Sequence, residues 1–122
     1  MPDRDWRVSV TDMIVHSRYA RAHVQGLDAT AFASDIKAQH AVACCVEIFG
    51  EAAKHVPEAV RQRAPGVPWR GIMGARNILA HAYARVDPAI LWGLGDRELS
   101  VMEDHLNALL DAPTPDGGSE SR

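Results

Sequence analysis

Apolar residues recur at helical spacing along most of the chain. From Asp5 to Val24 they lie three or four positions apart with Arg and Asp between them, which predicts an amphipathic helix. Asp28 is a suitable N-cap for a second helix, which the apolar pattern extends to Phe49. Gly50 follows in the same pattern. Because glycine in a helix costs about 1 kcal/mol relative to alanine, it indicates either close packing or a bend.

Prolines set the expected boundaries in the middle of the chain. Pro57 can begin a short helix that ends near Ala64, and the prolines and glycine within residues 65–68 force a turn. Pro68 also fits the first turn of the next helix, which we expect over residues 69–84. One apolar stripe is expected along this helix, made by Ile72, Ala75, Leu79, Ala82 and Val86.

A final helix is expected after this one. Asp87 followed by Pro88 is typical of an N-cap and a first helical turn. Gly93 and Gly95 then predict a break or kink before the apolar stripe resumes at Leu99. No alternating β-branched run and no internal repeat occurs in the sequence. The chain is therefore predicted to be all-α, an antiparallel bundle of about four or five helices.

The length fits one domain. With 122 residues, 47% of them hydrophobic, the chain can bury a single core. We expect the helical domain to occupy residues 1–111. Residues 112–122 are rich in Pro, Gly, Ser and acidic residues, and this tail is predicted to be disordered.

The chain is expected to be cytoplasmic. No apolar run reaches the roughly 18–20 residues of a membrane span, and the charged N-terminus is not followed by a signal-peptide stretch. Cys44 and Cys45 are adjacent in a helical stretch, where neighbouring side chains point in different directions, so both are expected to be buried, reduced packing residues. With no further spaced Cys or His ligands, no metal site and no cofactor are expected.

Charge is unevenly distributed. The net charge of −3 weakly disfavours a nucleic-acid partner, yet no acidic residue lies between Glu58 and Asp87. Five arginines fall in that window: Arg61, Arg63, Arg70, Arg76 and Arg85. Such a local basic patch is what a surface that meets phosphate would need, and Arg70 and Arg85 are candidate RNA-binding residues. The alternative is a set of arginines scattered on a solvated face.

The polar segment with the most chemistry spans residues 76–83. It places a guanidinium, an amide, an imidazole and a phenol in about two helical turns. Asn77 and His81, four positions apart, share a face on the far side from the apolar stripe. Arg76 and Tyr83 lie at the edge of the stripe, within about 20° of each other. Asn77 and His81 are therefore not expected in the core, whereas the long side chains of Arg76 and Tyr83 can lean toward either face.

A dimer is expected from the same helix. Met73 and Ile78 lie off the stripe, so the helix is apolar on more sides than one bundle buries, and a second subunit is the simplest explanation. One His with a neighbouring Arg is also the minimal set for cleaving RNA without metal, because His can move a proton and Arg can stabilise charge on phosphorus. Two-fold symmetry would supply both an acid and a base.

The segment resembles a known family signature. Arg76 to Tyr83 reads Arg-Asn-Ile-Leu-Ala-His-Ala-Tyr and is similar to the Arg-x4-His-x-Tyr motif of the HepT-like branch of the HEPN superfamily. Phe49-Gly50-Glu51-Ala52 resembles the IGEA block of that family, with Phe49 in place of the usual Ile. Pro68-Trp69-Arg70 resembles its PWR block, and Val86-Asp87 with Trp92 its vDxxxxW continuation. The resemblance covers residues 6–110.

The resemblance implies a HEPN-like homodimeric ribonuclease toxin of a type VII-like toxin–antitoxin system. Arg76 and His81 would be catalytic and Asn77 supporting, with RNA as substrate. The cognate antitoxin would be a minimal nucleotidyltransferase that transfers AMP to Tyr83. The alternative is a catalytically silent subunit that binds a nucleotide or scaffolds a nucleotidyltransferase complex, and the acidic net charge favours it.

Overall fold

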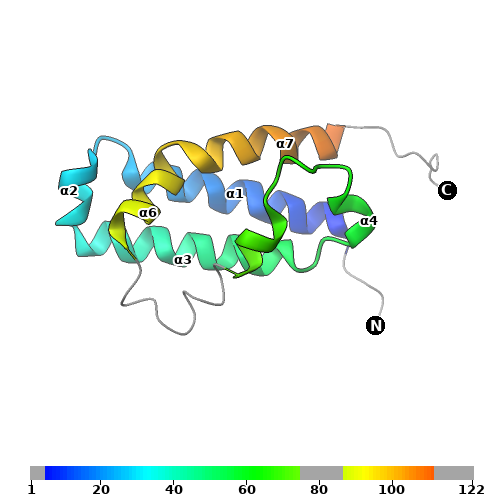
Figure 1. Ribbon diagram of the computed structural model, residues 1–122, viewed down its shortest axis with the longest axis horizontal. Coiled ribbons are helices and arrows are strands. Elements are labelled where there is room, and N and C mark those ends of the chain that lie inside the picture. The colour runs from blue at the N-terminus through cyan, green and yellow to red at the C-terminus, as the bar shows by residue number, and fades with distance from the viewer. Residues whose placement is uncertain (1–4, 75–86, 112–122) are drawn as a thin grey trace.

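Two long antiparallel helices, α1 (Trp6–Val24) and α3 (Ile36–Ala53), form the centre of the molecule (Figure 1). A third, α7 (Leu99–Asp111), runs along α1 in the opposite direction. The structure is a computed structural model, and it describes residues 5–74 and 87–111. All regular secondary structure in these two ranges is helical, so the fold is all-α.

The first helix matches its sequence prediction. The carboxylate of Asp5 accepts a hydrogen bond from the backbone N–H of Arg7 at 2.9 Å and caps the helix. Gly26, at a φ of 83°, allows the turn that follows, because this left-handed conformation is unfavourable for other residues. The apolar positions that predicted the helix are buried: Val10, Met13, Ile14, Ala20 and Val24.

The single helix predicted from Asp28 to Phe49 is wrong. Two helices occupy this stretch, α2 (Ala29–Ala33) and α3. The carboxylate of Asp28 caps α2 at 2.7 Å from the N–H of Ala31, and that of Asp35 caps α3 at 2.9 Å from the N–H of Ala38. Aspartate competes with helical hydrogen bonding through its own side chain, and here it begins a new helix. Gly50 is buried and α3 continues through it.

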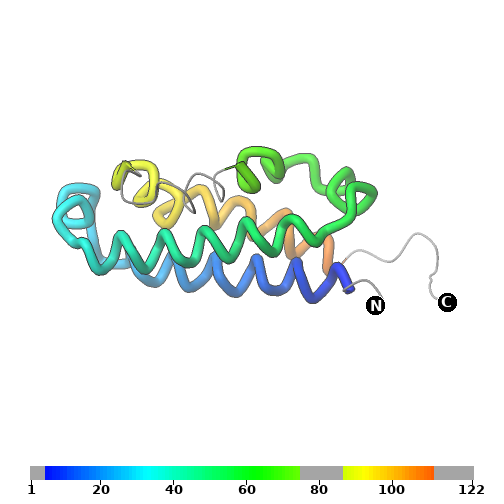
Figure 2. The backbone as a smooth tube through the Cα atoms, turned by 90° about the horizontal axis from the view of Figure 1, so that it is seen from below, coloured from blue at the N-terminus to red at the C-terminus, as the bar shows by residue number. Residues whose placement is uncertain are grey.

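The middle of the chain crosses one side of the α1–α3 pair. Helix α4 (Glu58–Arg61) is shorter than predicted, with Pro57 as its N-cap rather than its first residue. After a turn, residues 69–74 are helical. Figure 2 shows α4, residues 69–74 and α6 (Pro88–Gly93) on the same side of α1 and α3. The rest of the predicted 69–84 helix lies outside the described residues, as does the tail 112–122.

The break or kink predicted at Gly93 and Gly95 takes the form of a change in helix type and not of a break. Helix α6 passes without interruption into a π-helical turn, η2 (Leu94–Glu98), and then into α7. A Cβ on Gly95 would lie 2.8 Å from Cγ1 of Val24 and 3.3 Å from the carbonyl oxygen of Ala20. Glycine is therefore required here by the close approach of η2 to α1. Gly95 lies within the π-helical turn, which has one more residue between hydrogen-bonded groups than an α-helix.

The adjacent cysteines differ, contrary to the prediction that both are buried. Cys45 is buried among core residues, whereas Cys44 is exposed and both are free thiols. Two neighbouring positions on a helix are about 100° apart, so one turns to the core and the other to solvent. Burial, and then the neighbouring Cys44, raises the pKa of the Cys45 thiol. The thiol of Cys45 is therefore a packing group.

Candidate functional site

The predicted catalytic segment falls outside the part of the chain that the structure describes. Arg76, Asn77, His81, Tyr83 and Arg85 all lie in residues 75–86. Of the predicted site residues, the structure describes one more, the arginine at position 70, which is exposed in the helical segment 69–74. The structure therefore describes the residues on either side of the segment, which end at Gly74 before it and begin again at Asp87 after it.

The chain that leads into the segment is held by Trp69. Its side chain is 8% exposed, and its indole N–H donates to the carbonyl oxygen of Ala64 at 3.1 Å. This bond closes the turn in front of residues 69–74. Ile72 is buried, as its place on the predicted stripe requires. Met73, predicted to lie off the stripe, is half-buried and packs against the core, so it gives no support to a second subunit.

The chain that leaves the segment is held by Trp92. Its indole N–H donates to the carbonyl oxygen of Leu27 at 2.9 Å and so fixes α6 to the turn between α1 and α2. Asp87 accepts from the N–H of Ala89 at 2.9 Å, with Pro88 in the first turn of α6, as predicted. The flank after residues 75–86 is thus tied to the α1–α2 turn by Trp92, and the flank before them is held by the local bond of Trp69.

The structure describes three arginines of the basic window between Glu58 and Asp87, and each has different contacts. Arg61 donates from Nε to the carbonyl oxygen of Val56 at 2.8 Å, and its Nη1 lies 3.3 Å from a carboxylate oxygen of Glu58. The guanidinium of Arg63 lies 5.5 Å from the ring centroid of Trp6. Arg70 has no ion pair within the described ranges. Among the arginines of the window that the structure describes, Arg70 is therefore the most available for an anionic ligand.

An acidic pair on α3 has local partners. Glu51 lies 3.8 Å from the Nζ of Lys54 and 3.5 Å from the Nε2 of His55. Glu47, four positions earlier, is half-buried. The Glu51 contacts are with its own helix and the residues just after it, and they make a solvated charge cluster.

A buried carboxylate escaped the sequence analysis. Glu103 of α7 is 5% exposed and accepts from the hydroxyl of Ser17 at 2.5 Å and from Nη1 of Arg21 at 2.8 and 2.9 Å. Arg18 adds a contact at 3.7 Å. A glutamate between Met102 and Leu106 on an apolar stripe was the available signal. A buried charge on a helix needs a partner on the neighbouring helix.

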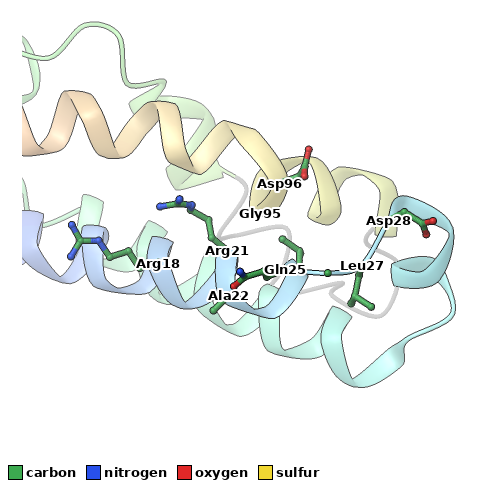
Figure 3. Close-up of a pocket in the computed structure, with 10 residues that line it drawn as sticks. Arg18, Arg21, Ala22, Gln25, Leu27, Asp28, Gly95 and Asp96 are labelled. Carbon is green, nitrogen blue, oxygen red and sulfur yellow. The ribbon is translucent and has the colours of Figure 1, made fainter.

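Beside this cluster, Arg18 and Arg21 line an open pocket of about 710 Å³, whose other walls include Asp28 and Asp96 (Figure 3). Figure 3 shows Arg21 reaching from α1 towards α7. Both arginines already face the carboxylate of Glu103, and the two aspartates add negative charge. This pocket is therefore a weaker phosphate site than its arginines alone indicate.

Within residues 5–74 and 87–111, no three His, Cys, Asp or Glu side chains gather where a metal ion could be held. Nor is any helix in these ranges long and apolar enough to cross a membrane.

An all-α bundle with exposed arginine next to a segment that carries Arg and His indicates the class of small helical ribonucleases. The sequence profile of the family described as "Ribonuclease HepT-like" matches residues 13–109. The chain therefore belongs to the HepT-like ribonuclease family. The matched range includes the segment from Arg76 to Tyr83.

Individual relatives agree with this family. The chain is 30% identical over 92 residues to a provisionally named RNase of Methanocaldococcus jannaschii. These residues are 75% of this chain and 84% of that protein. A second provisionally named RNase of the same organism is 26% identical over 110 residues, or 90% of this chain and 95% of that protein. A provisionally named ribonuclease HepT of Thermococcus cleftensis is 43% identical over 61 residues, or 50% and 56% of the two chains. No solved structure matches the chain significantly.

Proposed function

We propose that this protein is a metal-independent endoribonuclease toxin of a type VII-like toxin–antitoxin system. The observation that carries the proposal is the match of the HepT-like ribonuclease family over residues 13–109, a range that contains an Arg, an Asn, a His and a Tyr in the order of the Arg-x4-His-x-Tyr motif. In this proposal Arg76 and His81 are catalytic, Asn77 supports them, and Arg70 and Arg85 contribute to RNA binding.

The proposed reaction is attack of an RNA 2′-hydroxyl on its own 3′-phosphate. A base removes the 2′-proton as the new O–P bond forms, and an acid protonates the departing 5′-oxygen as the old O–P bond breaks. The products are a 2′,3′-cyclic phosphate and a free 5′-hydroxyl. His81 is the proton-transfer group, since its unperturbed pKa of about 6.5 suits both roles. Arg76 stabilises the charge that develops on the phosphoryl oxygens.

A homodimer is part of the proposal. One histidine cannot be base and acid at once in a single turnover, and a two-fold dimer supplies a second His81 to the same cleft. Ile78, an apolar residue off the predicted stripe, is the sequence feature that supports an interface there. The proposed domain extends over residues 1–111, with 112–122 as a disordered tail, and the proposed location is the cytoplasm.

Control by a cognate minimal nucleotidyltransferase completes the proposal. This antitoxin would transfer AMP to Tyr83. In this step the phenol oxygen of Tyr83, two positions from His81, would lose its proton and attack the α-phosphorus of ATP, and pyrophosphate would leave. The attached phosphate would carry about one negative charge next to the proposed catalytic groups, where it repels RNA. Modified protein should therefore remain dimeric and lose its ribonuclease activity.

The decisive experiment uses purified protein and total RNA in EDTA. We expect cleavage in the chelator, no cleavage by His81→Ala or Arg76→Ala, and none by Arg76→Lys, because an ammonium group does not reproduce a bidentate contact with phosphate. Circular dichroism serves as the control that each variant folds. Intact RNA with the wild-type protein, freed of any AMP as judged by its mass, would favour the silent nucleotide-binding or scaffold subunit instead.

A further inference from the structure

A groove of about 270 Å³ lies between α4 and the turn that precedes residues 69–74. Its polar lining comes from Glu58, Arg61, Gln62 and Arg70, and its apolar lining from Pro65, Val67 and Trp69. We call it the Arg61–Arg70 groove. Its volume is below the roughly 300–1,000 Å³ of typical small-molecule pockets. This size suits part of a chain that passes through better than an enclosed ligand.

The two arginines of the groove differ in how firmly their side chains are held. Arg61 is held in place, because its Nε donates to the carbonyl oxygen of Val56 and its side chain is 22% exposed. A fixed guanidinium loses little rotamer entropy when it binds an anion. Arg70 is exposed and has no ion pair within the described ranges. The two guanidiniums therefore offer one preset and one adaptable donor for phosphate oxygens.

Between them the groove has a fixed apolar floor. The Trp69 indole is locked by its hydrogen bond to Ala64, and Val67 is buried beneath the turn. Pro65 is exposed at the surface and has a rigid ring. Trp69 and Val67 are buried and make this floor rigid, and the exposed ring of Pro65 is the apolar surface that a sugar can contact between the two arginines.

The groove is also near the proposed catalytic segment in the chain. Arg76 follows Arg70 by six positions, and six Cα–Cα steps span at most about 22 Å when fully extended. Successive nucleotides of a stacked strand rise about 3.4 Å along its axis, so this limit corresponds to at most roughly six nucleotides. RNA held in the groove could therefore reach the proposed cleavage site.

We propose that the Arg61–Arg70 groove binds the phosphate backbone of single-stranded RNA a few nucleotides from the bond that is cut. The proposal rests on the proposed ribonuclease function for its substrate. Glu58 modulates the site, because its carboxylate, 68% exposed, lies in the groove against Arg61. RNA must compete with this carboxylate for Arg61, so Glu58 weakens binding.

The test measures binding of a short fluorescein-labelled single-stranded oligoribonucleotide to the full chain by fluorescence anisotropy across a range of salt concentrations. All proteins carry His81→Ala, so the RNA stays intact. Arg70→Ala should weaken binding about tenfold and reduce the slope of log K against log salt by about 0.7. Glu58→Gln should tighten binding about twofold, a gain that misfolding would not produce.

The matched control is Arg97→Ala. Arg97 is exposed in η2, outside the groove, and its removal changes the net charge by the same amount. Equal affinities and equal salt slopes for Arg70→Ala and Arg97→Ala would overturn the groove, as would unchanged affinity in Glu58→Gln. Failure of the ribonuclease proposal looks different: wild-type protein would leave RNA uncut while binding still depended on Arg70. If the wild-type protein cuts RNA and Arg70→Ala leaves the KM unchanged, the ribonuclease proposal holds and only the proposal for the groove is refuted.

Discussion

Arg21 holds Glu103 with one nitrogen against both carboxylate oxygens, at 2.8 and 2.9 Å, across the contact between α1 and α7. Ser17, one turn earlier on α1, donates to the same carboxylate at 2.5 Å. Glu103 is 5% exposed, so it meets very little water and depends on these partners. The ion pair of Arg21 and Glu103 therefore ties α7 to α1 at a point where an unpaired charge would destabilise the fold.

Arg21→Ala should lower the free energy of unfolding by about 2 kcal/mol. Breaking a fully buried ion pair costs about 3–5 kcal/mol, and the value is discounted here because the Arg21 side chain is 40% exposed. Urea denaturation followed by circular dichroism measures the change. Arg18→Ala is the matched control: that side chain is 61% exposed and 3.7 Å from Glu103, so it should cost less than about 0.5 kcal/mol. If both variants lost the same amount of unfolding free energy, Arg21 would not be the residue that compensates the buried charge of Glu103.

Gly95→Ala should destabilise the protein, and Gly93→Ala should not. The new methyl group at Gly95 would lie 2.8 Å from the Val24 side chain and 3.3 Å from the Ala20 backbone oxygen, which cannot move away easily. Such overpacking costs about 1–3 kcal/mol. At Gly93 the nearest atom is an Oε2 of Glu98 at 3.5 Å, an ordinary contact, and alanine gains about 1 kcal/mol in helix propensity. Thermal unfolding of both variants tests the difference. A Gly95→Ala protein as stable as wild type would refute the close approach of η2 and α1.

Local signals explain which parts of the fold the sequence predicts. The N-cap at Asp87 and the apolar spacing of α1 act within a few residues, and the structure confirms them. Asp35 gives an equally local signal, yet the apolar pattern that continues across it hides the break between α2 and α3. The glycines at 93 and 95 predict an irregularity locally, but the close approach of Gly95 to Val24 is a contact between distant residues that no local pattern reveals.

The candidate site shows the same division. Its Arg, Asn, His and Tyr are recognisable because their order in the sequence is itself the signal. The hydrogen bonds that hold its flanks, from Trp69 to Ala64 and from Trp92 to Leu27, are in part tertiary contacts that spacing does not reveal. The arrangement of the four residues themselves stays a prediction, since they lie outside the described ranges.

Cys44 should react with a maleimide in the folded protein, whereas Cys45 should react only after unfolding. Cys44 is exposed, and the Cys45 thiol is buried with a raised pKa, which disfavours its reactive thiolate. Mass spectrometry of peptides after brief labelling measures both sites. Preferential labelling of Cys45 would contradict the orientation of α3.

The raised pKa of Cys45 also predicts the direction of a pH effect. In the unfolded chain the thiol titrates near its ordinary value of 9.0, and in the folded chain at a higher pH. The thiol form that folding favours is present in both states below pH 9, so its contribution to stability is complete there and is lost as the pH rises through the folded pKa. Wild-type stability should therefore fall more than that of Cys45→Ala above pH 9. Parallel curves for the two proteins would argue against the shift.

Tyr83→Phe is the sharpest test of the proposed control. The substitution removes the acceptor oxygen and keeps the aromatic ring, so folding should be preserved, which circular dichroism can check. If Tyr83 is only the acceptor of AMP, the variant should be toxic in cells with and without the nucleotidyltransferase. Its intact mass should not change when the two are expressed together, whereas the wild-type mass should rise in steps of one AMP.

Two other results would change the assignment of Tyr83 in different ways. A variant that is harmless under both conditions would indicate that the phenol itself takes part in cleavage or binds RNA, since a missing acceptor alone cannot remove activity. A variant that is toxic alone but harmless with the nucleotidyltransferase would refute Tyr83 as the modified residue. Inhibition would then require another acceptor or simple binding, and the mass of the co-expressed variant separates these: an added AMP identifies another acceptor, and an unchanged mass identifies binding.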